Sequence, residues 1–263
     1  MESIIYEYYR DKSAEMSIFR SKSGKVQRHF HRSIEILYIL SGGIECKIGD
    51  ESFFAEENDI IFVHNYFPHA FLPNDEYDKY VIIFPENYGN DIGKLLKEST
   101  LPSHLSDKEF NKECILPIFN QMFLEKDEMP HLVKKGYLNV IFGRLFDNYP
   151  QKQIKTASST EFMVDVLSYI DEHYSDNLTL DSIASEFGYN KYYFSRIFNK
   201  YVGEGLTNYV NVVRVRNFMK KFKENSSPQI SKLAFECGFD AMPTFYRAFS
   251  KVYGKSPKAY FKK

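Results

Sequence analysis

Three histidines and one glutamate near the start of the chain have the types and spacing to bind a metal ion or a polar ligand: His29, His31, Glu35 and His69. On a strand, positions 29, 31 and 35 share a parity and point to one face, and His69 would come from a neighbouring strand. Three imidazoles and a carboxylate suit Zn, Fe, Mn or Ni. They could instead line a pocket for a hydroxylated ligand such as a sugar, or be satisfied by neighbours at the mouth of a barrel. We favour the ligand pocket and expect no metal cofactor.

The last hundred residues contain one pattern twice. Its apolar, glycine and basic positions recur 50 residues later as far as the pair Gly188 and Gly238. Beyond that pair they recur 51 residues later. The first copy has Ile183-Ala184, Gly188-Tyr189, Arg196-Ile197-Phe198, Gly203 and Tyr209, and the second has Leu233-Ala234, Gly238-Phe239, Arg247-Ala248-Phe249, Gly254 and Tyr260. A repeat that stays in step is one supersecondary unit used twice. The pattern predicts two helix-turn-helix modules, each with a recognition helix for a major groove.

The outward face of each recognition helix follows from its apolar positions. In the first copy Phe194 and Phe198, four residues apart, point to the core, and the 3.6-residue period then turns outward Lys191, Tyr192, Ser195 and Arg196. The corresponding outward residues of the second copy are Met242, Pro243, Tyr246 and Arg247. Met and Pro offer only apolar contacts, for instance to a thymine methyl group. We therefore expect weaker sequence discrimination by the second module.

A net charge of −1 hides an uneven distribution of charge along the chain. From Asn190 to the end there are 15 Lys and Arg against 4 Asp and Glu, whereas residues 1–160 carry 19 against 24. The basic excess coincides with the repeat, where double-stranded DNA would need it. Contacts to phosphates, which position the protein without reading sequence, are expected from Lys191, Asn199, Lys200, Lys251, Lys255 and Lys258.

Several classes of protein are disfavoured by the sequence. The three cysteines are scattered, so they form neither a disulfide framework nor a zinc motif. The N-terminus lacks the pattern of a signal peptide, and no apolar run is long enough to span a membrane, which favours the cytoplasm. No nucleophile triad and no phosphate-binding loop is visible, so we expect no enzyme.

The elements that must position these residues follow from periodicity and turn signals. Residues 1 to about 85 predict short strands at 34–40, 44–48, 60–63 and 80–84, an arrangement typical of a barrel or jelly roll. Residues 107–149 change to helical spacing, and the polar stretch 148–160 indicates a linker. Further helices are predicted at 162–174, 179–187, 190–201 and 206–222, with Asp240 as the cap of the second recognition helix.

One predicted helix, at 132–149, has an apolar stripe that admits two interpretations. The stripe consists of Leu138, Ile141, Phe142, Leu145 and Phe146. Packed against a symmetry mate, it would form a twofold dimer. The same stripe could instead cover the barrel.

The C-terminal hundred residues resemble the AraC/XylS family of bacterial transcription regulators. The resemblance is carried by LTLDSIASEFGYNKYYFSRIFNKYVG, by residues 209–214, and by ISKLAFECGFDAMPTFYRAFSKVYGKSPKAYF. The N-terminal part resembles the cupin-type sensor domain, and the spacing HxHxxxE…G…H resembles the cupin metal motif, which such regulators often keep in part without metal. The resemblance implies that Tyr192, Ser195 and Arg196 and their counterparts face the bases. It also favours the dimer as the role of the stripe.

Together these features predict an α+β protein of two domains. Residues 1–150 would form a cupin-like β-barrel that senses a ligand and dimerises through helices. Residues 151–160 would be a linker, and 161–263 an all-α domain with two helix-turn-helix modules joined by a long helix. The expected protein is a cytoplasmic homodimeric regulator, an activator rather than a repressor, with a sugar-like effector and with RNA polymerase as a partner. The alternatives are a metal-dependent cupin enzyme fused to a DNA-binding domain and a ligand-independent DNA-binding regulator.

Overall fold

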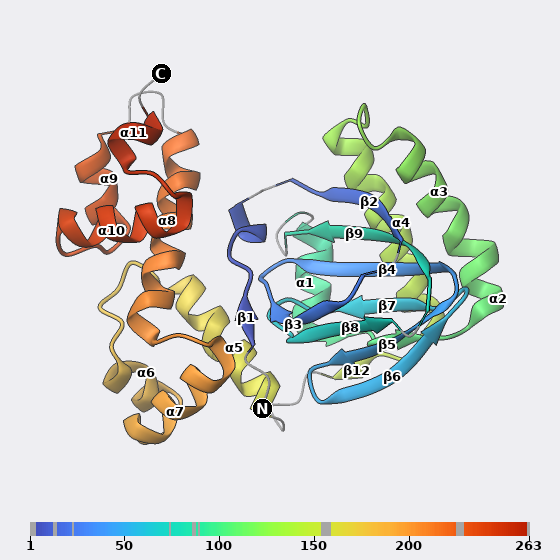
Figure 1. Cartoon of the computed structure of the whole chain (residues 1–263), viewed down its shortest axis with the longest axis horizontal. Helices are drawn as coiled ribbons and strands as arrows, with labels where there is room; N and C mark the ends of the chain where they lie inside the picture. Colours follow the sequence, from blue (N-terminus) through green and yellow to red (C-terminus); the bar gives the residue numbers. More distant parts are fainter. Residues whose placement is uncertain are drawn as a thin grey trace. The chain divides into compact units, whose positions relative to one another are not determined.

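The computed structural model describes residues 4–12, 15–22, 24–73, 75–85, 88, 90–153, 159–224 and 229–261. Contacts divide the chain into two compact units. One is Ser13–Glu161, and the other combines Met1–Lys12 with Phe162–Lys263. The first unit contains two antiparallel sheets with helices, and the second is mainly helical (Figure 1). The first residues of the chain thus group with the C-terminal helices and not with the sensor domain, where we expected them.

Two sheets form the body of the first unit. One holds, in this order, β11 (His104–Leu105), β7 (Ile60–Val63), β4 (Ile34–Ser41), β9 (Asp78–Phe84) and β2 (Ser17–Lys22). The other holds β3 (Val26–Phe30), β8 (His69–Pro73), β5 (Gly43–Ile48) and β6 (Glu51–Glu56). The strands predicted at 34–40, 44–48, 60–63 and 80–84 are all present, with ends that move by no more than two residues.

Strand β4 contributes side chains to two hydrophobic cores. Leu37 and Ile39 join the apolar cluster between the two sheets, whereas Ile34, Ile36 and Tyr38 join the cluster between their own sheet and the helices. Because successive side chains of a strand point to opposite faces, a strand that is covered on both sides is apolar throughout. The sheet of β4 is therefore the middle of three layers.

The turn from β4 to β5 depends on glycine. Gly42 has a φ of +74°, in the left-handed region, and a Cβ placed on it would lie 2.4 Å from the carbonyl oxygen of Glu76. Only glycine combines this backbone conformation with such a close approach. The turn signal Ser41-Gly42-Gly43 in the sequence has this physical origin.

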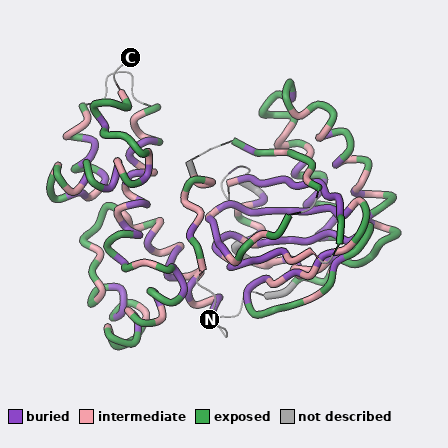
Figure 2. Tube along the Cα trace, viewed as in Figure 1, coloured by how far each residue is buried: buried purple, intermediate pink, exposed green. Residues whose placement is uncertain are grey.

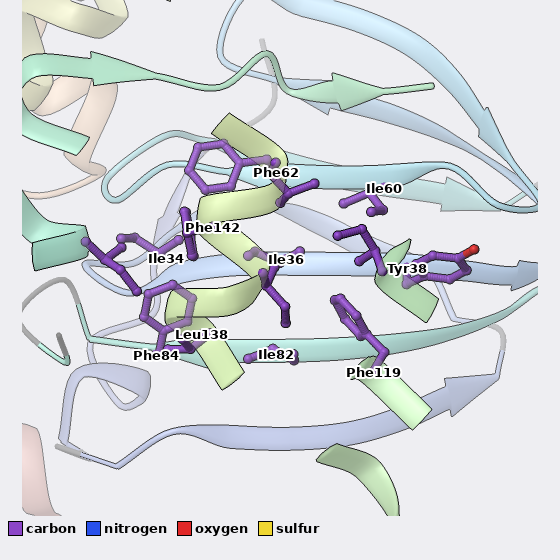
Figure 3. Close-up of a cluster of buried hydrophobic side chains, with 14 of the residues drawn as sticks. Ile34, Ile36, Tyr38, Ile60, Phe62, Ile82, Phe84, Phe119, Leu138 and Phe142 are labelled. Carbon is purple, nitrogen blue, oxygen red and sulfur yellow. The ribbon is translucent and has the colours of Figure 1, made fainter. Parts of the chain in front are cut away.

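Helices cover the outer face of the β4 sheet. They are α1 (Asn90–Glu98), α2 (Lys108–Phe110), a π-helical turn (Asn111–Ile115) that leads into α3 (Leu116–Glu125), and α4 (His131–Asn148). Figure 3 shows side chains of α3 and α4 lying against the isoleucines of β4 and β9. The ring of Phe142 meets those of Phe62 and Phe84 edge to face, with centroids 6.1 and 5.8 Å apart.

The predicted dimer stripe belongs to this core. Its five residues are between 0 and 9% exposed within a single chain: Leu138, Ile141, Phe142, Leu145 and Phe146. They are already covered by the barrel and are not available to a second copy. The interpretation of the stripe as a dimer interface is therefore wrong, and the alternative, that it covers the barrel, is confirmed. Periodicity shows that a helix has a buried face but not which partner buries it.

The second unit is built around a long helix. Its helices are α5 (Ser159–Glu172), α6 (Leu180–Glu186), α7 (Lys191–Val202), α8 (Leu206–Glu224), α9 (Ile230–Glu236), α10 (Met242–Tyr253) and α11 (Pro257–Phe261). Tyr209 of α8 packs on Phe198 of α7, and Phe218 of α8 packs on Phe245 of α10. Figure 2 shows buried and exposed residues alternating along the helices of this unit, as expected for helices with one buried face. Helix α8 is thus the connector that the sequence predicts.

The N-terminal segment packs on the connector helix. It comprises β1 (Ile5–Tyr6) and a 3-10 turn (Arg10–Lys12). The ring of Tyr6 lies 5.1 Å from that of Tyr209, and its hydroxyl donates to Oδ2 of Asp11 over 2.7 Å. Asp11 also lies 3.8 Å from Arg216, which pairs with Asp171 at 2.7 Å. The segment therefore adds both apolar and ionic contacts to the helical unit.

The predicted linker falls only partly within the described residues. Its first part contains β12 (Lys152–Gln153), which pairs with β10 (Ser99–Thr100), whereas residues 154–158 lie outside the described part of the chain. Among the residues that the structure describes, no helix has the length and apolar character to cross a membrane.

Candidate DNA interface and effector site

The first helix-turn-helix module is fixed by caps at both of its helices. Thr179 and Ser182 form a reciprocal capping box at the start of α6, with distances of 3.0 and 2.9 Å. Asn190 caps α7 by accepting from the amide of Tyr192 at 2.9 Å. Gly188 takes the left-handed turn between the helices, with a φ of +72°. The two caps and the turn fix the orientation of α7 relative to α6.

The outward face of α7 has the residues that the sequence predicts. Phe194 and Phe198 are fully buried, and Tyr192 is 76% exposed, with Arg196 exposed beside it. Ser195 is half-buried. The recognition face thus presents an aromatic hydroxyl and a guanidinium, both of which suit hydrogen bonds to base edges.

Sequence reasoning missed one residue on this face. Tyr193 is 44% exposed, and its ring stacks on that of Tyr189 with centroids 5.6 Å apart. The guanidinium carbon of Arg196 lies 5.6 Å from the centre of the Tyr193 ring. A cation over an aromatic face is attracted by the ring, so Tyr193 helps to orient Arg196. The i to i+3 spacing of the two residues on a helix was the available signal.

The second module has the same arrangement of helices, but its recognition helix begins with fewer polar side chains. Helix α10 begins with half-buried Met242 and exposed Pro243, followed by exposed Tyr246 and Arg247. Pro243 lies in the first turn, where its missing N–H leaves no helical hydrogen bond unmade. Arg247 Nη2 donates to the hydroxyl of Thr244 over 3.5 Å. Met242 and Pro243 bring only apolar atoms to this end of the helix.

The prediction that Asp240 caps the second recognition helix is wrong. Ala241 occupies the cap position, and it makes no side-chain hydrogen bond there. Ala241 offers no side-chain acceptor, but Pro243 has no N–H and the amide of Thr244 donates to the backbone oxygen of Ala241 over 3.1 Å. Because the two copies are offset by 51 residues after the glycines, Ala241 is the counterpart of the cap residue Asn190, and Asp240 lies one position earlier.

The predicted phosphate contacts all lie at the surface, but two are engaged within the protein. Asn199, Lys200, Lys255 and Lys258 are exposed. Lys191 pairs with Asp181 at 3.2 Å, and Lys251 pairs with Glu204. These two pairs must open or share their charge if the lysines contact phosphates. Exposed pairs of this kind contribute little to stability, so opening them is inexpensive.

Arg214 of the connector helix has a structural role. Its Nε and Nη2 atoms each donate over 2.8 Å to a backbone carbonyl, the first of Tyr174 and the second of Asp176. It therefore ties α8 to the loop that precedes α6 and supports the first module.

In the barrel, the structure brings together the four residues singled out in the sequence. We call His29, His31, Glu35 and His69 the histidine cluster; all are between 0 and 5% exposed. His29 of β3 and His69 of β8 are register partners, with ring centres 4.1 Å apart. One ring nitrogen from each of the three histidines lies within 4.8 Å of the others. Such a group can hold a metal ion or accept hydrogen bonds from a ligand.

The electrostatics of the histidine cluster centre on Glu35. Its Oε2 lies 3.2 Å from Nε2 of His31 and 3.7 Å from Nε2 of His69. Burial by itself would raise the pKa of Glu35, but hydrogen bonds from His31 and His69 outweigh it and hold that pKa well below its usual value. Burial lowers the pKa of His69. The cluster thus holds a carboxylate among imidazoles, out of contact with solvent.

Two family models match the chain. A helix-turn-helix domain matches residues 183–263, which include both recognition helices. An AraC-like ligand binding domain matches residues 19–135, which include the whole histidine cluster. Together the two matches span most of the chain.

Curated relatives match mainly the C-terminal part of the chain. The regulatory protein PocR of Salmonella typhimurium is 36% identical over 98 residues, which are 37% of this chain and 32% of PocR. The transcriptional activator AarP of Providencia stuartii is 28% identical over 46% of this chain and 87% of AarP. The TetD protein of transposon Tn10 from Escherichia coli is 30% identical over 38% of this chain and 72% of TetD. The chain therefore spans about a third of PocR but most of the two shorter relatives.

Proposed function

The chain belongs to the AraC/XylS family of DNA-binding transcription regulators, and on that basis we propose that it is an effector-responsive activator. Its N-terminal part is a ligand-binding domain of this family, and its C-terminal part is a helix-turn-helix domain. We propose that the effector binds in the barrel at the histidine cluster, and that its binding changes the affinity of the two recognition helices for DNA. The change in DNA affinity that the effector causes can be no larger than the difference between its affinities for the two conformations of the regulator.

The observation that carries this proposal is the pair of matched recognition helices. Both α7 and α10 bury two phenylalanines and leave a tyrosine and an arginine exposed, which are Tyr192 and Arg196 in one and Tyr246 and Arg247 in the other. Both are packed on the same connector helix, α8. Two helices on one rigid connector suit two successive major grooves on one side of the duplex, about one helical turn apart.

The finer features of the proposal follow from chemistry and from the relatives. The cluster accepts hydrogen bonds, so a hydroxylated, sugar-like molecule is one class of effector that suits it. The name of AarP, a transcriptional activator, supports activation, and we propose RNA polymerase as the partner. We propose a regulator that works in the cytoplasm, where the DNA is, and that has no catalytic activity. A homodimer stays part of the proposal, but it must use residues other than the stripe of α4.

Selection of binding sites from random double-stranded DNA tests the proposal. We expect the full-length chain to enrich one asymmetric sequence with two conserved segments whose centres lie about 10 base pairs apart. The segment read by α7 should be more strongly conserved than the one read by α10. Footprints on the enriched site, recorded with and without candidate effectors, then test whether a small molecule changes DNA affinity.

Matched variants identify the surface that reads DNA. Arg196→Ala and Arg247→Ala should each weaken binding to the enriched site, and Lys112→Ala, which removes one exposed positive charge from the barrel unit, should not. Failure to enrich any sequence above random DNA would refute sequence-specific binding. A footprint that no small molecule alters, across sugars and metal ions, would instead support the ligand-independent regulator.

A further inference from the structure

A buried lysine of the barrel, Lys79 of β9, has no acidic partner in the described part of the chain. It is 5% exposed, and it shares the parity of Val81 and Ile83, which point into the core between the two sheets. Lysine side chains usually extend until the ammonium group reaches water. The neighbouring carboxylate, Asp78, has the opposite parity and pairs with Arg20. Because a buried charge is costly unless it is paired, the position of Lys79 indicates that a negative group binds there.

Aromatic side chains surround the ammonium group of Lys79. Its Nζ donates to the hydroxyl of Tyr77 over 2.6 Å, and it lies 4.5 Å from the centre of the Tyr77 ring and 5.3 Å from that of Phe71. The faces of the two rings attract a cation but do not neutralise its charge. An ammonium group has several N–H donors, of which the hydroxyl of Tyr77 accepts one. The remaining donors and the charge suit an anionic acceptor.

The surroundings of Lys79 connect it to both the histidine cluster and the end of the barrel. The ring of Phe71, which lies beside the ammonium group, has its centre 5.6 Å from that of His69. Lys79 and the histidine cluster therefore adjoin the same aromatic ring. On the other side, the hydroxyl of Tyr77 donates over 3.2 Å to the carbonyl oxygen of Gly24, which is exposed. A small molecule between the sheets would thus reach the ammonium group and the imidazoles together.

We propose that Lys79 binds the carboxylate of a small monocarboxylic acid inside the barrel. A carboxylate accepts several hydrogen bonds and carries one negative charge, so it would take the remaining donors of the ammonium group and neutralise it. A phosphate monoester carries up to two negative charges, and one lysine would leave part of that charge buried and unpaired. If the histidine cluster contacts the hydroxyl groups of the effector, which rests on the proposed function, the effector is a sugar acid.

Without an anion, Lys79 destabilises the barrel. Burial lowers the pKa of its ammonium group, and the negative charge of Glu35 opposes this shift only in part. Methionine has a similar length and would fill the same apolar surroundings without a charge. Replacing Lys79 by methionine should therefore leave the unliganded protein at least as stable as the wild type. A lysine with a purely structural role would instead lose stability on replacement.

Thermal unfolding of the full-length protein tests carboxylate binding with pairs of compounds that differ in the carboxylate group. The pairs are gluconate with glucitol, galacturonate with galactose, and butyrate with butanol, at an ionic strength kept constant with chloride. At a hundred times its dissociation constant, a sugar acid should raise the midpoint of barrel unfolding by about 5–10 °C. The neutral counterpart should bind at least about 30-fold more weakly, because it leaves the buried lysine without a negative partner.

Variants assign the carboxylate to Lys79. Lys79→Met should weaken the binding of the sugar acid by at least about 30-fold without lowering the unfolding midpoint of the unliganded protein. Lys112→Met, which removes an exposed lysine of the same unit, should bind the acid as the wild type does. If Lys79→Met does not fold, Lys79→Gln decides, since its amide still hydrogen-bonds to the hydroxyl of Tyr77 but carries no charge.

The absence of any response to the carboxylates, or equal responses to the acids and their neutral counterparts, overturns the proposal. A response that Lys79→Met and Lys79→Gln both retain overturns it as well, and so does a loss of stability in both unliganded variants. A response to butyrate alone keeps the carboxylate site and refutes the sugar acid. If a sugar acid binds but leaves DNA affinity unchanged in the footprint, the site stands and its role as the effector site fails. Loss of sequence-specific DNA binding would refute the proposed function without affecting the thermal shifts.

Discussion

The ring of Phe142 meets the ring of Phe84 edge to face, with centroids 5.8 Å apart and planes at 84°. Phe142 belongs to α4 and Phe84 to β9, so the contact joins the outer helix to the middle sheet. Both side chains are 1% exposed. Helix α4, whose periodicity admitted a role in a dimer, therefore packs on the barrel and forms part of its core.

We predict that Phe142→Ala lowers the free energy of unfolding of the barrel by about 3–5 kcal/mol, because it removes a large ring from a closed core. Val140→Ala, on the exposed face of the same helix, should change it by less than about 0.5 kcal/mol. Urea unfolding followed by circular dichroism gives both values. A Phe142→Ala protein with unchanged stability but a smaller oligomer would show instead that the ring belongs to an interface.

Arg196→Ala should weaken binding to the selected DNA site by about 1–3 kcal/mol, a factor of roughly 5 to 150, and should relax the preference at one or two base pairs. Lys255→Ala should weaken binding to all sequences alike and should lower the slope of log K against log salt by about one unit. Fluorescence anisotropy at several salt concentrations separates the two effects. An equal loss on specific and random DNA would make Arg196 a phosphate contact.

Gly238→Ala should destabilise the helical unit more than Gly188→Ala. Both glycines have positive φ, +85° and +72°, so alanine costs about 1–2 kcal/mol at either position. At Gly238 the new Cβ would also lie 2.7 Å from the carbonyl oxygen of Ser175, whereas at Gly188 it would meet nothing within 4 Å. The crowding should add at least about 1 kcal/mol. Equal losses in urea unfolding would show that the loop at Ser175 moves aside freely.

Tyr6→Ala should loosen the connector helix, because the ring packs on Tyr209 and the hydroxyl holds Asp11 beside Arg216. Removing a buried aromatic ring costs about 3 kcal/mol, so amide exchange in α8 should accelerate. Exchange measured by mass spectrometry tests this, with Tyr9→Ala as the control at a more exposed ring of the same segment. Unchanged exchange in α8 would mean that the segment does not support the helix.

Only one of the three thiols should react quickly in the native protein. Burial raises the pKa of Cys46 to about 12 and that of Cys237 to about 11, so both are almost fully protonated at pH 8. Cys114 is half-buried and should react first with Ellman's reagent. Cys114→Ser should remove the fast phase. A fast phase that survives this substitution would show that one of the buried thiols becomes exposed.

The helix-turn-helix modules were predictable almost residue by residue because local rules determine them. Glycine at a left-handed turn, a polar cap such as Asn190, and phenylalanines four residues apart act within a dozen residues. The same rules failed at Asp240, where one inserted residue moved the cap to Ala241. Tyr193 was missed although its i, i+3 spacing to Arg196 was readable, and its stacking on Tyr189 depends on the turn that precedes the helix.

By itself, the sequence determined four of the barrel strands, the two recognition helices and the identity of the four residues in the histidine cluster, since strand parity and helical period are properties of the local backbone. Only the tertiary structure decided which surface buries the stripe of α4, that Tyr6 packs on Tyr209, and that Nε2 of His31 and of His69 lie 3.2 and 3.7 Å from the buried carboxylate of Glu35. Those relationships join segments far apart in the chain, and they depend on which faces meet when apolar surface leaves water.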